Sequence, residues 1–587
     1  MNSQAAVSVL LGLLLCISHP SLAQKKKSTP TFPPAEEAIK NDVGPWGLPF
    51  ADLKRKLDKG FAAFDAAYEA AHPKAAPLSY AVGIETSLRK VFRNKWWFKG
   101  EITDTVRLSA CRNEVESFQI AVIPKMGKEL ENVTVTWDGL KGPGEIPKKN
   151  ITIYRVLFVK TLPAQYPTKH TGYWPDALMP LKPFSVKGLD LGLLWCDVRV
   201  PKDAPPGEYE GLITIRPAGS PPVEVKVKLR VRDFAIPDRV PFPMTVWPQT
   251  KEPKDWKAPM PPERFLEYCA MFLEHHIDPC SIGSLYIKRK DLQPGDLELL
   301  DKHLQFCLDR GMLCFRAMRY KSDKDMKAYY DHIKAKGWLD KCFLYGAQDE
   351  PALEQFNEKV IPDTTRIRRD YPGLRVLLAT EWHPNLDQGV DLFMTDVSTG
   401  FELYGTPQRP RGREALWWYF CHLPVRIDFT RPLVEAPNMQ IDNDAVEHRI
   451  AYWMMWKYEV KGCFIWNGTS WPRGLNANWP EEEWVVQEKP YGYPYAGIHN
   501  GNGYLVYPGP HPSLRIKVLR DGAEDYAYLL ALEAAKERLS GKAREEAEAL
   551  LAVPKDLVVD THYFNRNPQA LLDHRERVAG LIEMARK

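Results

Sequence analysis

Two adjacent carboxylates, Asp349 and Glu350, are the residues of this sequence best suited to chemistry, and Pro351 follows them directly. They come just after Cys342–Tyr345, a short aromatic and aliphatic run that predicts a buried strand. Neighbouring side chains of a strand point to opposite faces, so the two carboxylates can converge on one ligand only where the strand has ended. Pro351 disfavours helical geometry at Glu350, and we expect an extended chain there. One acid that donates a proton, beside one that stays ionised, could carry out general acid–base chemistry.

The same residues also fit a purely structural interpretation. Aspartate is a preferred N-cap residue, and Glu and Pro suit the first turn of a helix. Asp349 could therefore cap a helix that starts with Glu350 and Pro351, and this role is compatible with a functional one. The position of the pair at the end of a predicted strand favours the functional interpretation.

Aromatic residues are concentrated after the carboxylate pair. Nine of the 18 tryptophans lie between residues 382 and 484. Flat indole rings suit the apolar faces of sugar rings, and the indole N–H and nearby polar groups can fix hydroxyls. Trp382, Trp466 and Trp471 follow predicted strands, and we expect them to line a binding site. We also expect Tyr345 and Glu381 to contact the ligand, while core packing remains the alternative for the three indoles.

The elements that must position these residues begin after Pro237, where short apolar runs alternate with helical stretches. The predicted strands are Met244–Trp247, Cys280–Leu285, Met312–Met318, Cys342–Tyr345, Arg375–Ala379, Leu392–Thr395, Leu416–Cys421 and Gly462–Trp466. Eight strands over roughly 250 residues match a TIM-like (β/α)8 barrel, whose sites lie at the C-terminal strand ends. Asp349 and Glu350 follow the fourth strand. A doubly wound open sheet is the alternative, because the sequence does not show closure.

The preceding region has the periodicity of strands. Phe118, Ile120 and Val122 alternate with polar or small residues, and Val223–Val231 alternates Val and Leu with charged residues. Such strands bury one face and leave the other in water. Several short alternating strands with few helical patterns predict an antiparallel β-sandwich.

The C-terminal region has helical periodicity. Its apolar and charged residues alternate at helical spacing from about residue 510 to the end. We expect Arg515, Arg520, Asp521 and Asp525 to form an ion-paired seam that closes the side of the barrel. This region is predicted to have a structural role.

The first residues have the features of a secretory signal. Residues 1–6 carry no acid, an apolar run covers Ala5–Ile17, and Ser21-Leu22-Ala23 places small residues at a cleavage site before Gln24. A membrane anchor is the alternative, but the run is short for a span. We therefore expect a secreted or periplasmic protein. The predicted organisation is multidomain: a signal peptide over 1–23, a linker and N-terminal helix over 24–84, a β-sandwich over 85–236, a barrel over 237–505 and a helical region over 506–587.

Composition and motifs exclude several classes. The chain has 587 residues and a net charge of +4, and 26% of its residues are charged, which predicts no nucleic-acid groove. No segment after the signal is long and apolar enough to span a membrane. The sequence has no GxGxxG, Walker, HExxH or CxxC motif, so we expect no cofactor and no metal. It leaves the oligomeric state open.

At Asp349-Glu350-Pro351, after an aromatic strand, the sequence resembles the catalytic motif of glycoside hydrolase family 123. Further stretches similar to this family and its relatives of unassigned function are Val200–Tyr209, Trp417–Cys421, Trp453–Tyr458, Gly462–Trp466, Tyr504–Gly509, Ser513–Arg515 and Leu519–Tyr526. The resemblance covers most of the chain from about residue 85 to 535. It implies an N-terminal β-sandwich and a catalytic barrel.

The resemblance also implies an activity, the exo-hydrolysis of β-linked N-acetylgalactosamine. It implies a substrate-assisted mechanism, an exception to the usual carboxylate-separation rules, in which the acetamido oxygen of the sugar attacks the anomeric carbon. Glu350 would be the general acid and then the base. Asp349 would orient the acetamido group and stabilise the oxazolinium charge.

Two alternatives to this activity remain. The chain could be a glycosidase for a different sugar that uses the same carboxylates in another way. It could also be a non-catalytic secreted protein that binds carbohydrate, because a fold does not fix a function. The presence of both Asp349 and Glu350 argues against the second alternative.

Overall fold

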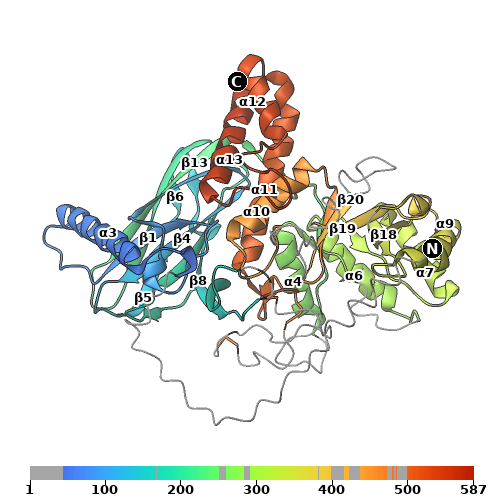
Figure 1. The fold of residues 1–587 in the computed structure, drawn as a ribbon, viewed down its shortest axis with the longest axis horizontal. Coiled ribbons are helices and arrows are strands. Elements are labelled where there is room, and N and C mark those ends of the chain that lie inside the picture. The colour runs from blue at the N-terminus through green and yellow to red at the C-terminus, as the bar shows by residue number, and fades with distance from the viewer. Residues whose placement is uncertain are drawn as a thin grey trace, which may run out of the picture.

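The computed structural model describes residues 44–164, 166, 168–249, 260–282, 291–380, 382–397, 416–421, 436–471, 479–480, 484 and 499–586. The predicted signal peptide and Glu381 lie outside these residues. Figure 1 shows a β-rich region at one side of the molecule, a barrel at the other, and the C-terminal helices between and above them. The chain is therefore multidomain, as predicted.

The N-terminal helix lies on the β-rich region. The short turn η1 (Gly44–Trp46) precedes α3 (Phe50–Ala71), which contacts β1, β2 and η2 (Lys95–Trp97). The buried residues of α3 are Leu53, Leu57, Phe61 and Phe64. This is the apolar face that the spacing of three and four residues creates.

Two sheets form the β-rich region. The first has the order β2 (Glu101–Ile102), β1 (Tyr80–Thr86), β4 (Val115–Pro124), β11 (Gly192–Arg199), β8 (Ile151–Lys160) and β9 (Tyr173–Pro180). The second has the order β10 (Phe184–Val186), β5 (Leu130–Trp137), β12 (Gly207–Arg216), β13 (Val223–Ala235) and β3 (Thr105–Arg112), with β6 (Leu140–Lys141) and β7 (Glu145–Ile146) beside β12. The turn η3 (Lys148–Asn150) precedes β8.

The pairing and burial of these strands agree with the periodicity. Every pair in the two sheets is antiparallel except β13 with β3, which is parallel. Val225, Val227 and Leu229 of β13 are buried, and alternate residues face water. The apolar faces of both sheets belong to one core.

Eight parallel strands form the barrel. In sheet order they are β15 (Ile277–Pro279), β14 (Met244–Val246), β21 (Gly462–Ile465), β20 (Leu416–Phe420), β19 (Leu392–Asp396), β18 (Arg375–Ala379), β17 (Cys342–Tyr345) and β16 (Phe315–Arg316). Seven of them fall within or almost within their predicted ranges. The exception is β15, which precedes the predicted Cys280–Leu285 because the buried Asp278 interrupts its apolar run.

The barrel is nearly closed. The two strands at the ends of the sheet, β15 and β16, are joined by the Arg316 N–H, which donates to the Cys280 carbonyl oxygen at 2.7 Å. The Asp278 carboxylate accepts from the backbone N–H groups of Leu313 and Cys314, each at 3.2 Å. The ends of the sheet therefore meet, and the barrel prediction holds over the open-sheet alternative.

Helices connect the barrel strands and complete the C-terminal region. They are α4 (Pro262–Glu274), α6 (Asp296–Leu308), α7 (Asp323–Ala335), η5 (Leu339–Lys341), α8 (Leu353–Gln355), η6 (Phe356–Val360), α9 (Ile361–Asp370), η7 (Pro384–Leu386) and α10 (Ala445–Lys457). After the small hairpin of β22 (Val506–Tyr507) and β23 (His511–Pro512) follow α11 (Leu514–Ala535), η9 (Lys536–Arg538), α12 (Gly541–Leu551) and α13 (Pro568–Met584). No helix within the described ranges has the length and apolarity that crossing a bilayer requires.

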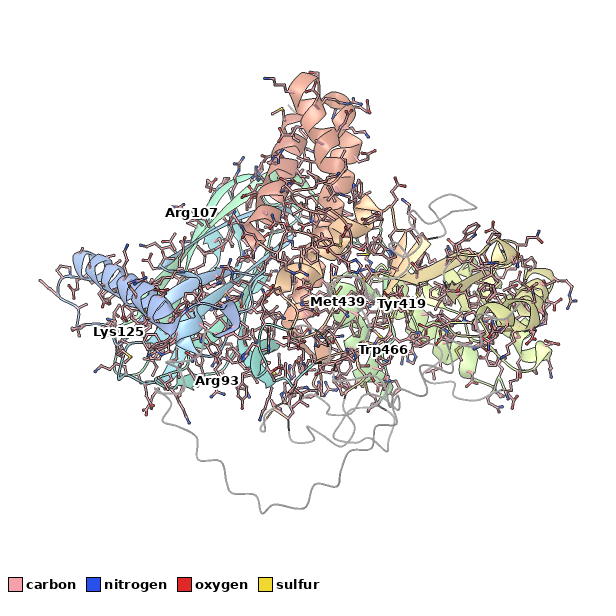
Figure 2. All side chains as sticks on the ribbon, viewed as in Figure 1. Arg93, Arg107, Lys125, Tyr419, Met439 and Trp466 are labelled. Carbon is pink, nitrogen blue, oxygen red and sulfur yellow. The ribbon has the colours of Figure 1, made fainter. Side chains whose placement is uncertain are left out.

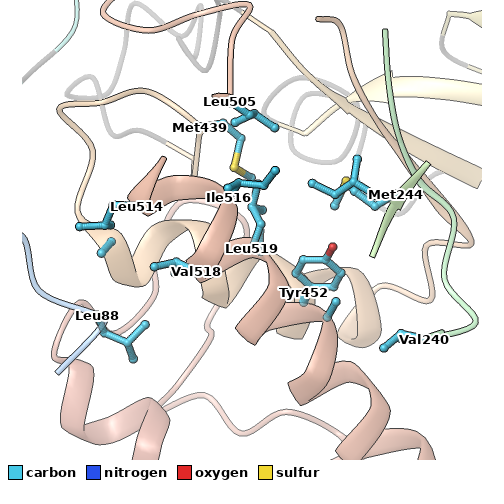
Figure 3. Close-up of a cluster of buried hydrophobic side chains, with 14 of the residues drawn as sticks. Leu88, Val240, Met244, Met439, Tyr452, Leu505, Leu514, Ile516, Val518 and Leu519 are labelled. Carbon is cyan, nitrogen blue, oxygen red and sulfur yellow. The ribbon is translucent and has the colours of Figure 1, made fainter. Parts of the chain in front are cut away.

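Helix α11 lies between the barrel and the β-rich region. It packs against α10 on one side and against β4 and β9 on the other. Gly522 permits the close approach of α10, because a Cβ there would lie 2.6 Å from a ring carbon of Tyr452. Figure 3 shows the apolar part of this contact, where Ile516 and Leu519 of α11 lie near Met244 of β14.

The ion-paired seam exists, and its acids face the barrel as expected, since Asp525 pairs with Arg449 of α10 at 2.7 Å, but its arginines face a different region. Arg515 pairs with Asp176 on β9 at 2.9 Å, and Arg520 pairs with Asp197 on β11 at 3.3 Å. Both partners belong to the β-rich region. The charged residues of α11 therefore attach the β-rich region to the barrel, where the sequence suggested only closure of the barrel side.

Candidate active site

Alternate residues of the barrel strands point inward, because side chains along a strand alternate between faces. The inward residues fill the barrel with an apolar cluster: Cys280, Cys314, Phe343, Leu377, Leu392, Met394, Trp417 and Phe464. The next inward positions toward the C-terminal strand ends hold Trp247, Arg316, Tyr345, Asp396, Tyr419 and Trp466. We refer to these six residues as the barrel mouth. Parallel barrels bind their ligands at this end.

Asp349 is held from the strand that precedes it. The Tyr345 hydroxyl donates to Asp349 Oδ1 at 2.6 Å. Burial raises the pKa of Tyr345, and the hydrogen bond to Asp349 raises it further. The phenol therefore keeps its proton at physiological pH and acts as a donor, while the Asp349 carboxylate itself is exposed.

Glu350 is held from another part of the barrel. The Tyr419 hydroxyl, on β20, donates to Glu350 Oε1 at 2.9 Å. Burial raises the pKa of Tyr419, and the nearby Asp396 carboxylate raises it further. Two strands separate β17 from β20 in the sheet, so this hydrogen bond spans part of the mouth.

The backbone at Glu350 differs from the extended chain that we expected before Pro351. Its φ is +42°, in the left-handed region that residues other than glycine seldom adopt. An extended chain would direct consecutive side chains to opposite sides. In the observed turn, Asp349 and Glu350 each reach a tyrosine of the barrel mouth. Strained backbone of this kind is concentrated at functional sites.

The carboxylate pair does not start a helix. Helix α8 begins at Leu353, and Ala352 is its N-cap residue. The Ala352 N–H donates to Gln355 Oε1 at 3.0 Å. Asp349 and Glu350 precede this turn, so the structure does not place Asp349 at the N-cap position of the structural alternative.

A cation lies between two aromatic rings beside Asp349. The Arg316 guanidinium is 4.4 Å from the ring centroid of Trp247 and 4.8 Å from that of Tyr345. Burial lowers the pKa of Arg316, although a guanidinium keeps its charge under all ordinary conditions. Such cation–aromatic contacts hold the ring that positions Asp349.

The end of β17 is also fixed from outside the barrel. The Arg319 guanidinium donates to the Tyr345 carbonyl oxygen at 3.1 Å and to Asp363 Oδ1 at 2.8 Å. Asp363 belongs to α9, which packs outside the strand. The backbone from which the carboxylates extend is therefore tied to a helix.

The predicted aromatic wall is only partly assembled. Trp466 lies at the barrel mouth, and its indole N–H donates to Asn502 Oδ1 at 2.6 Å. Trp382 packs instead on the cluster outside the barrel that contains Leu378, and it donates to Asp387 at 3.1 Å. Trp471 is fully buried and donates to the Val506 carbonyl oxygen at 2.8 Å, so it has no face for a ligand. Figure 2 marks Tyr419 and Trp466 in the barrel half of the molecule.

The sequence predicted that Asp349, Glu350, Tyr345 and Trp466 belong to one site, but it did not indicate the other residues of the barrel mouth. The missed residues are Trp247, Arg316, Asp396 and Tyr419. Each lies on or directly after a predicted strand, two or four residues along from another inward residue. Extending the period of two to the end of every strand would have indicated them.

Comparisons with known proteins agree with this architecture. Residues 315–532 match the family described as glycoside hydrolase 123, catalytic domain, and residues 92–217 match the glycoside hydrolase 123 N-terminal domain. No curated protein sequence matches the chain.

Two solved structures show similarity to the chain, to different degrees. A family 123 glycoside hydrolase from Clostridium perfringens, studied for glycolipid glycan hydrolysis, has 14% identity and a TM-score of 0.64 over 86% of this chain and 99% of that one. A family 39 glycoside hydrolase from Bacteroides cellulosilyticus WH2 has 10% identity and a TM-score of 0.29 over 72% of this chain and 81% of that one. The first shares the arrangement of domains seen here.

Proposed function

The chain belongs to glycoside hydrolase family 123 and is a glycoside hydrolase that acts on glycans, and from this premise we propose its substrate and mechanism. The substrate is a terminal β-linked N-acetylhexosamine, such as N-acetylgalactosamine, and the enzyme acts from the end of the glycan. One observation carries the proposal: consecutive exposed carboxylates, Asp349 and Glu350, are each held by a protonated tyrosine of the barrel mouth.

In the first step, Glu350 is the general acid. The acetamido oxygen of the sugar attacks the anomeric carbon, the bond from that carbon to the leaving oxygen breaks, and the Glu350 proton passes to the leaving oxygen. The Asp349 carboxylate accepts the acetamido N–H and stabilises the positive oxazolinium that forms. The Tyr345 hydroxyl fixes the direction of that carboxylate.

In the second step, Glu350 is the general base. It removes a proton from water as the water oxygen bonds to the anomeric carbon, and the oxazolinium ring opens to restore the acetamido group. Two inversions leave the anomeric configuration unchanged, so the product retains the β configuration. Glu350 ends the cycle protonated, as it began.

The rest of the barrel mouth supports a sugar ring at this position. Trp466 is held by Asn502, and Trp247 and Tyr345 are held by Arg316. Fixed aromatic rings suit the apolar face of a sugar, and the charged and hydroxyl groups beside them suit its polar edges.

A thiazoline analogue of N-acetylgalactosamine tests this mechanism against the alternative of a different sugar. A substrate-assisted site should bind the thiazoline tightly and competitively, because it resembles the oxazolinium intermediate. A screen of aryl glycosides should show hydrolysis of β-N-acetylhexosaminides. Hydrolysis of glycosides that lack an acetamido group, without inhibition by the thiazoline, would overturn the proposal and favour the alternative.

We also propose that the protein is exported to the periplasm or the exterior. The support is the apolar run Ala5–Ile17 followed by Ser21-Leu22-Ala23. N-terminal sequencing of protein expressed from the full gene should find Gln24 as the first residue. A mature protein that begins at Met1 would contradict export by this signal.

A further inference from the structure

A chain of buried charges joins the β-rich region to the helices α10, α11 and α13. Its bases and acids alternate, and each member lies within ion-pair distance of the next. In order the members are Lys517, Asp197, Arg520, Asp521, Arg449, Asp525, Arg575 and Glu114, and all of them are buried. The bases balance the acids in number. The two outermost acids, Asp197 on β11 and Glu114 just before β4, both belong to the β-rich region.

Glu116 of β4 is one of two further buried acids that lie beside this balanced chain. Its Oε2 lies 3.1 Å from Arg575 Nη2. The same guanidinium already pairs with Glu114 and Asp525 of the chain. The Tyr528 hydroxyl donates to Glu114, and burial raises the pKa of Tyr528 well above its ordinary value, so this phenol adds no charge. Glu116 therefore shares its base with two other acids.

Glu524 of α11 is the second further acid, and we refer to Glu116 and Glu524 as the extra acids. The Glu524 Oε1 accepts from the Val115 N–H at 3.1 Å, whereas its buried Oε2 has no hydrogen-bond partner within the described ranges. Arg520 is the base that acts on Glu524 most, and it is already engaged by Asp521 at 2.8 Å. A carboxylate in such a position is unfavourable when it is charged.

Burial raises the pKa of both extra acids, because the interior disfavours their charged forms. The pKa of Glu116 rises to about 8, although Arg575 of α13 and Arg449 of α10 act in the opposite direction. The neighbouring carboxylates Glu114 and Asp521 raise the pKa of both extra acids further. An ionised extra acid would therefore add a buried negative charge that the chain does not balance.

We propose that these charges form a proton-dependent latch between the β-rich region and the helices α11 and α13. Helix α11 contacts β4, α10 and α13 directly, and Figure 1 shows it between the β-rich region and the barrel. The latch is closed while Glu116 and Glu524 each carry a proton, because the buried charges are then balanced. Loss of both protons adds two negative charges near Glu114, and their repulsion loosens the contact between the start of β4 and α11. This inference is independent of the reaction at the barrel mouth.

The direction of the pH effect follows from where the protons are held more tightly. A glutamate in the unfolded chain has a pKa of about 4.3. Between that value and about pH 8, the folded protein keeps a proton on Glu116 that the unfolded chain has lost. The latch is therefore strongest at low pH within this range and weakens as the pH rises. Each such proton changes the equilibrium between open and closed forms about tenfold per pH unit.

Hydrogen–deuterium exchange of the full-length protein at pH 7 and pH 9 tests the latch. Peptides that cover residues 111–115 report on it, because the Val115 N–H donates to Glu524 and the Cys111 N–H donates to Glu114 at 2.6 Å. After correction for the intrinsic exchange rate, protection of these amides in the wild type should fall about tenfold or more between the two pH values. Peptides from the barrel strand β19 should keep their protection.

Variants assign the effect to the extra acids. Glu116→Gln resembles the neutral form of the side chain and should reduce the fall in protection about tenfold, and Glu524→Gln should reduce it as well. Glu447→Gln is the matched control. Burial raises the pKa of Glu447 to about 7, but its carboxylate accepts from Asn443 at 3.0 Å and faces Arg566 at 3.6 Å. This variant should leave the fall at residues 111–115 unchanged.

Three outcomes would overturn the proposal. The first is unchanged protection of residues 111–115 in the wild type between pH 7 and pH 9. The second is an equal fall in the wild type and in both variants of the extra acids. The third is a fall of the same size in β19, which would show global unfolding. Melting temperatures at pH 6 show whether each variant folds, and Glu116→Met replaces Glu116→Gln if the latter does not.

Discussion

The barrel mouth and the contact between α11 and the β-rich region use the same kinds of residue for different ends. At the mouth, Asp349 and Glu350 are exposed, and the hydrogen bond that holds each comes from a neutral tyrosine. At α11, Asp525 is fully buried and accepts two hydrogen bonds of 2.7 Å from Arg449. The Trp453 indole N–H donates to it as well, at 3.0 Å.

This contrast shows that the surroundings of a carboxylate determine whether it serves catalysis or stability. A carboxylate in the interior that accepts hydrogen bonds from arginines is needed for stability, because removing it leaves a buried charge without its partner. A carboxylate held by a neutral hydroxyl and open to water can gain and lose a proton during a reaction. The two regions should therefore respond oppositely to substitution, with activity lost at one and stability lost at the other.

The largest effect is expected at the mouth. Glu350→Gln should lower the turnover of substrates with poor leaving groups about 10²–10⁴-fold, the range for one general acid. Aryl substrates with good leaving groups need little protonation, so their first step should suffer much less. Asp349→Asn should slow both substrate types, because the oxazolinium loses its stabilising charge in either case.

Melting temperature measured on the same variants completes this test. Both proteins should melt close to the wild type, because both side chains are exposed. If Glu350→Gln turned over a poor substrate at the normal rate, the assignment of the acid would be wrong. If both variants lost stability and kept activity, the carboxylates would belong with the structural group at α11.

The reverse result is expected at Asp525. Asp525→Ala removes both short hydrogen bonds of Arg449 and leaves it only the longer contact with Asp521 at 3.9 Å, and breaking such a buried pair costs about 3–5 kcal/mol. Urea unfolding should show this loss, while the remaining folded protein keeps its KM. Glu548→Ala is the control, since its exposed pair with Arg544 on α12 should contribute less than about 1 kcal/mol. A fully stable Asp525→Ala protein with weakened substrate binding would overturn the structural role.

Lys90 is a third case to compare with the two groups of carboxylates, because its charge is buried and has only one distant ion-pair partner. Its Nζ is fully buried, has no hydrogen-bond partner among the described residues, and lies 3.9 Å from Asp176 Oδ1. Burial lowers the pKa of Lys90 to about 8, below its unfolded value of about 10.4. Between these two pH values the unfolded chain binds more protons, so this lysine makes stability rise with pH there, and its full cost applies below pH 8.

Lys90→Met should therefore stabilise the protein at pH 7, by an amount on the order of 2 kcal/mol, and the gain should shrink between about pH 8 and pH 10.4. Urea unfolding across this pH range measures it. Lys517→Met is the matched control and should destabilise, because Lys517 pairs with the buried Asp197 at 2.8 Å. Destabilisation by Lys90→Met at pH 7 would show that its weak pair with Asp176 outweighs the cost of burial.

The smallest effect is expected at Tyr419. Tyr419→Phe removes the hydroxyl that orients Glu350, and the loss of one such hydrogen bond should lower turnover about 3–10-fold. Tyr330→Phe deletes the same atom from a bond to the Pro372 carbonyl oxygen at 2.7 Å, away from the mouth, and should leave turnover unchanged. Steady-state kinetics on both variants decide the matter. An equal loss in the two variants would remove any special role for Tyr419.

Much of the fold followed from local pattern. The period of two in β13 and the eight apolar runs after Pro237 are direct consequences of burial, so both regions could be predicted. The pattern failed at β15, where Asp278 is buried because it accepts from two backbone N–H groups just before β16 and pairs with Arg239 at 2.8 Å. A sequence pattern cannot predict that an acid is buried when the groups that bind it lie in a distant part of the chain.

The site was predictable only where residues are adjacent in sequence. Asp349 and Glu350 stand together after a strand, but Tyr419 reaches Glu350 from 69 residues away. Trp466 and Trp471 look alike in the sequence, yet one lies at the barrel mouth and the other is fully buried. Closure of the barrel determines which residue reaches Glu350 and which tryptophan lies at the mouth, and the sequence pattern does not show that closure.

The position of α11 has a consequence for how this architecture can change over generations. Its buried arginines find their acids on the β-rich region, while Gly522 fits it against α10 of the barrel. A gene fragment that encoded the barrel alone would expose those cations and the apolar surface around Leu514 and Ile516. Recombination could therefore not exchange the β-rich region and the barrel independently of each other. They must be inherited together, with matched changes in the acids and bases where they meet.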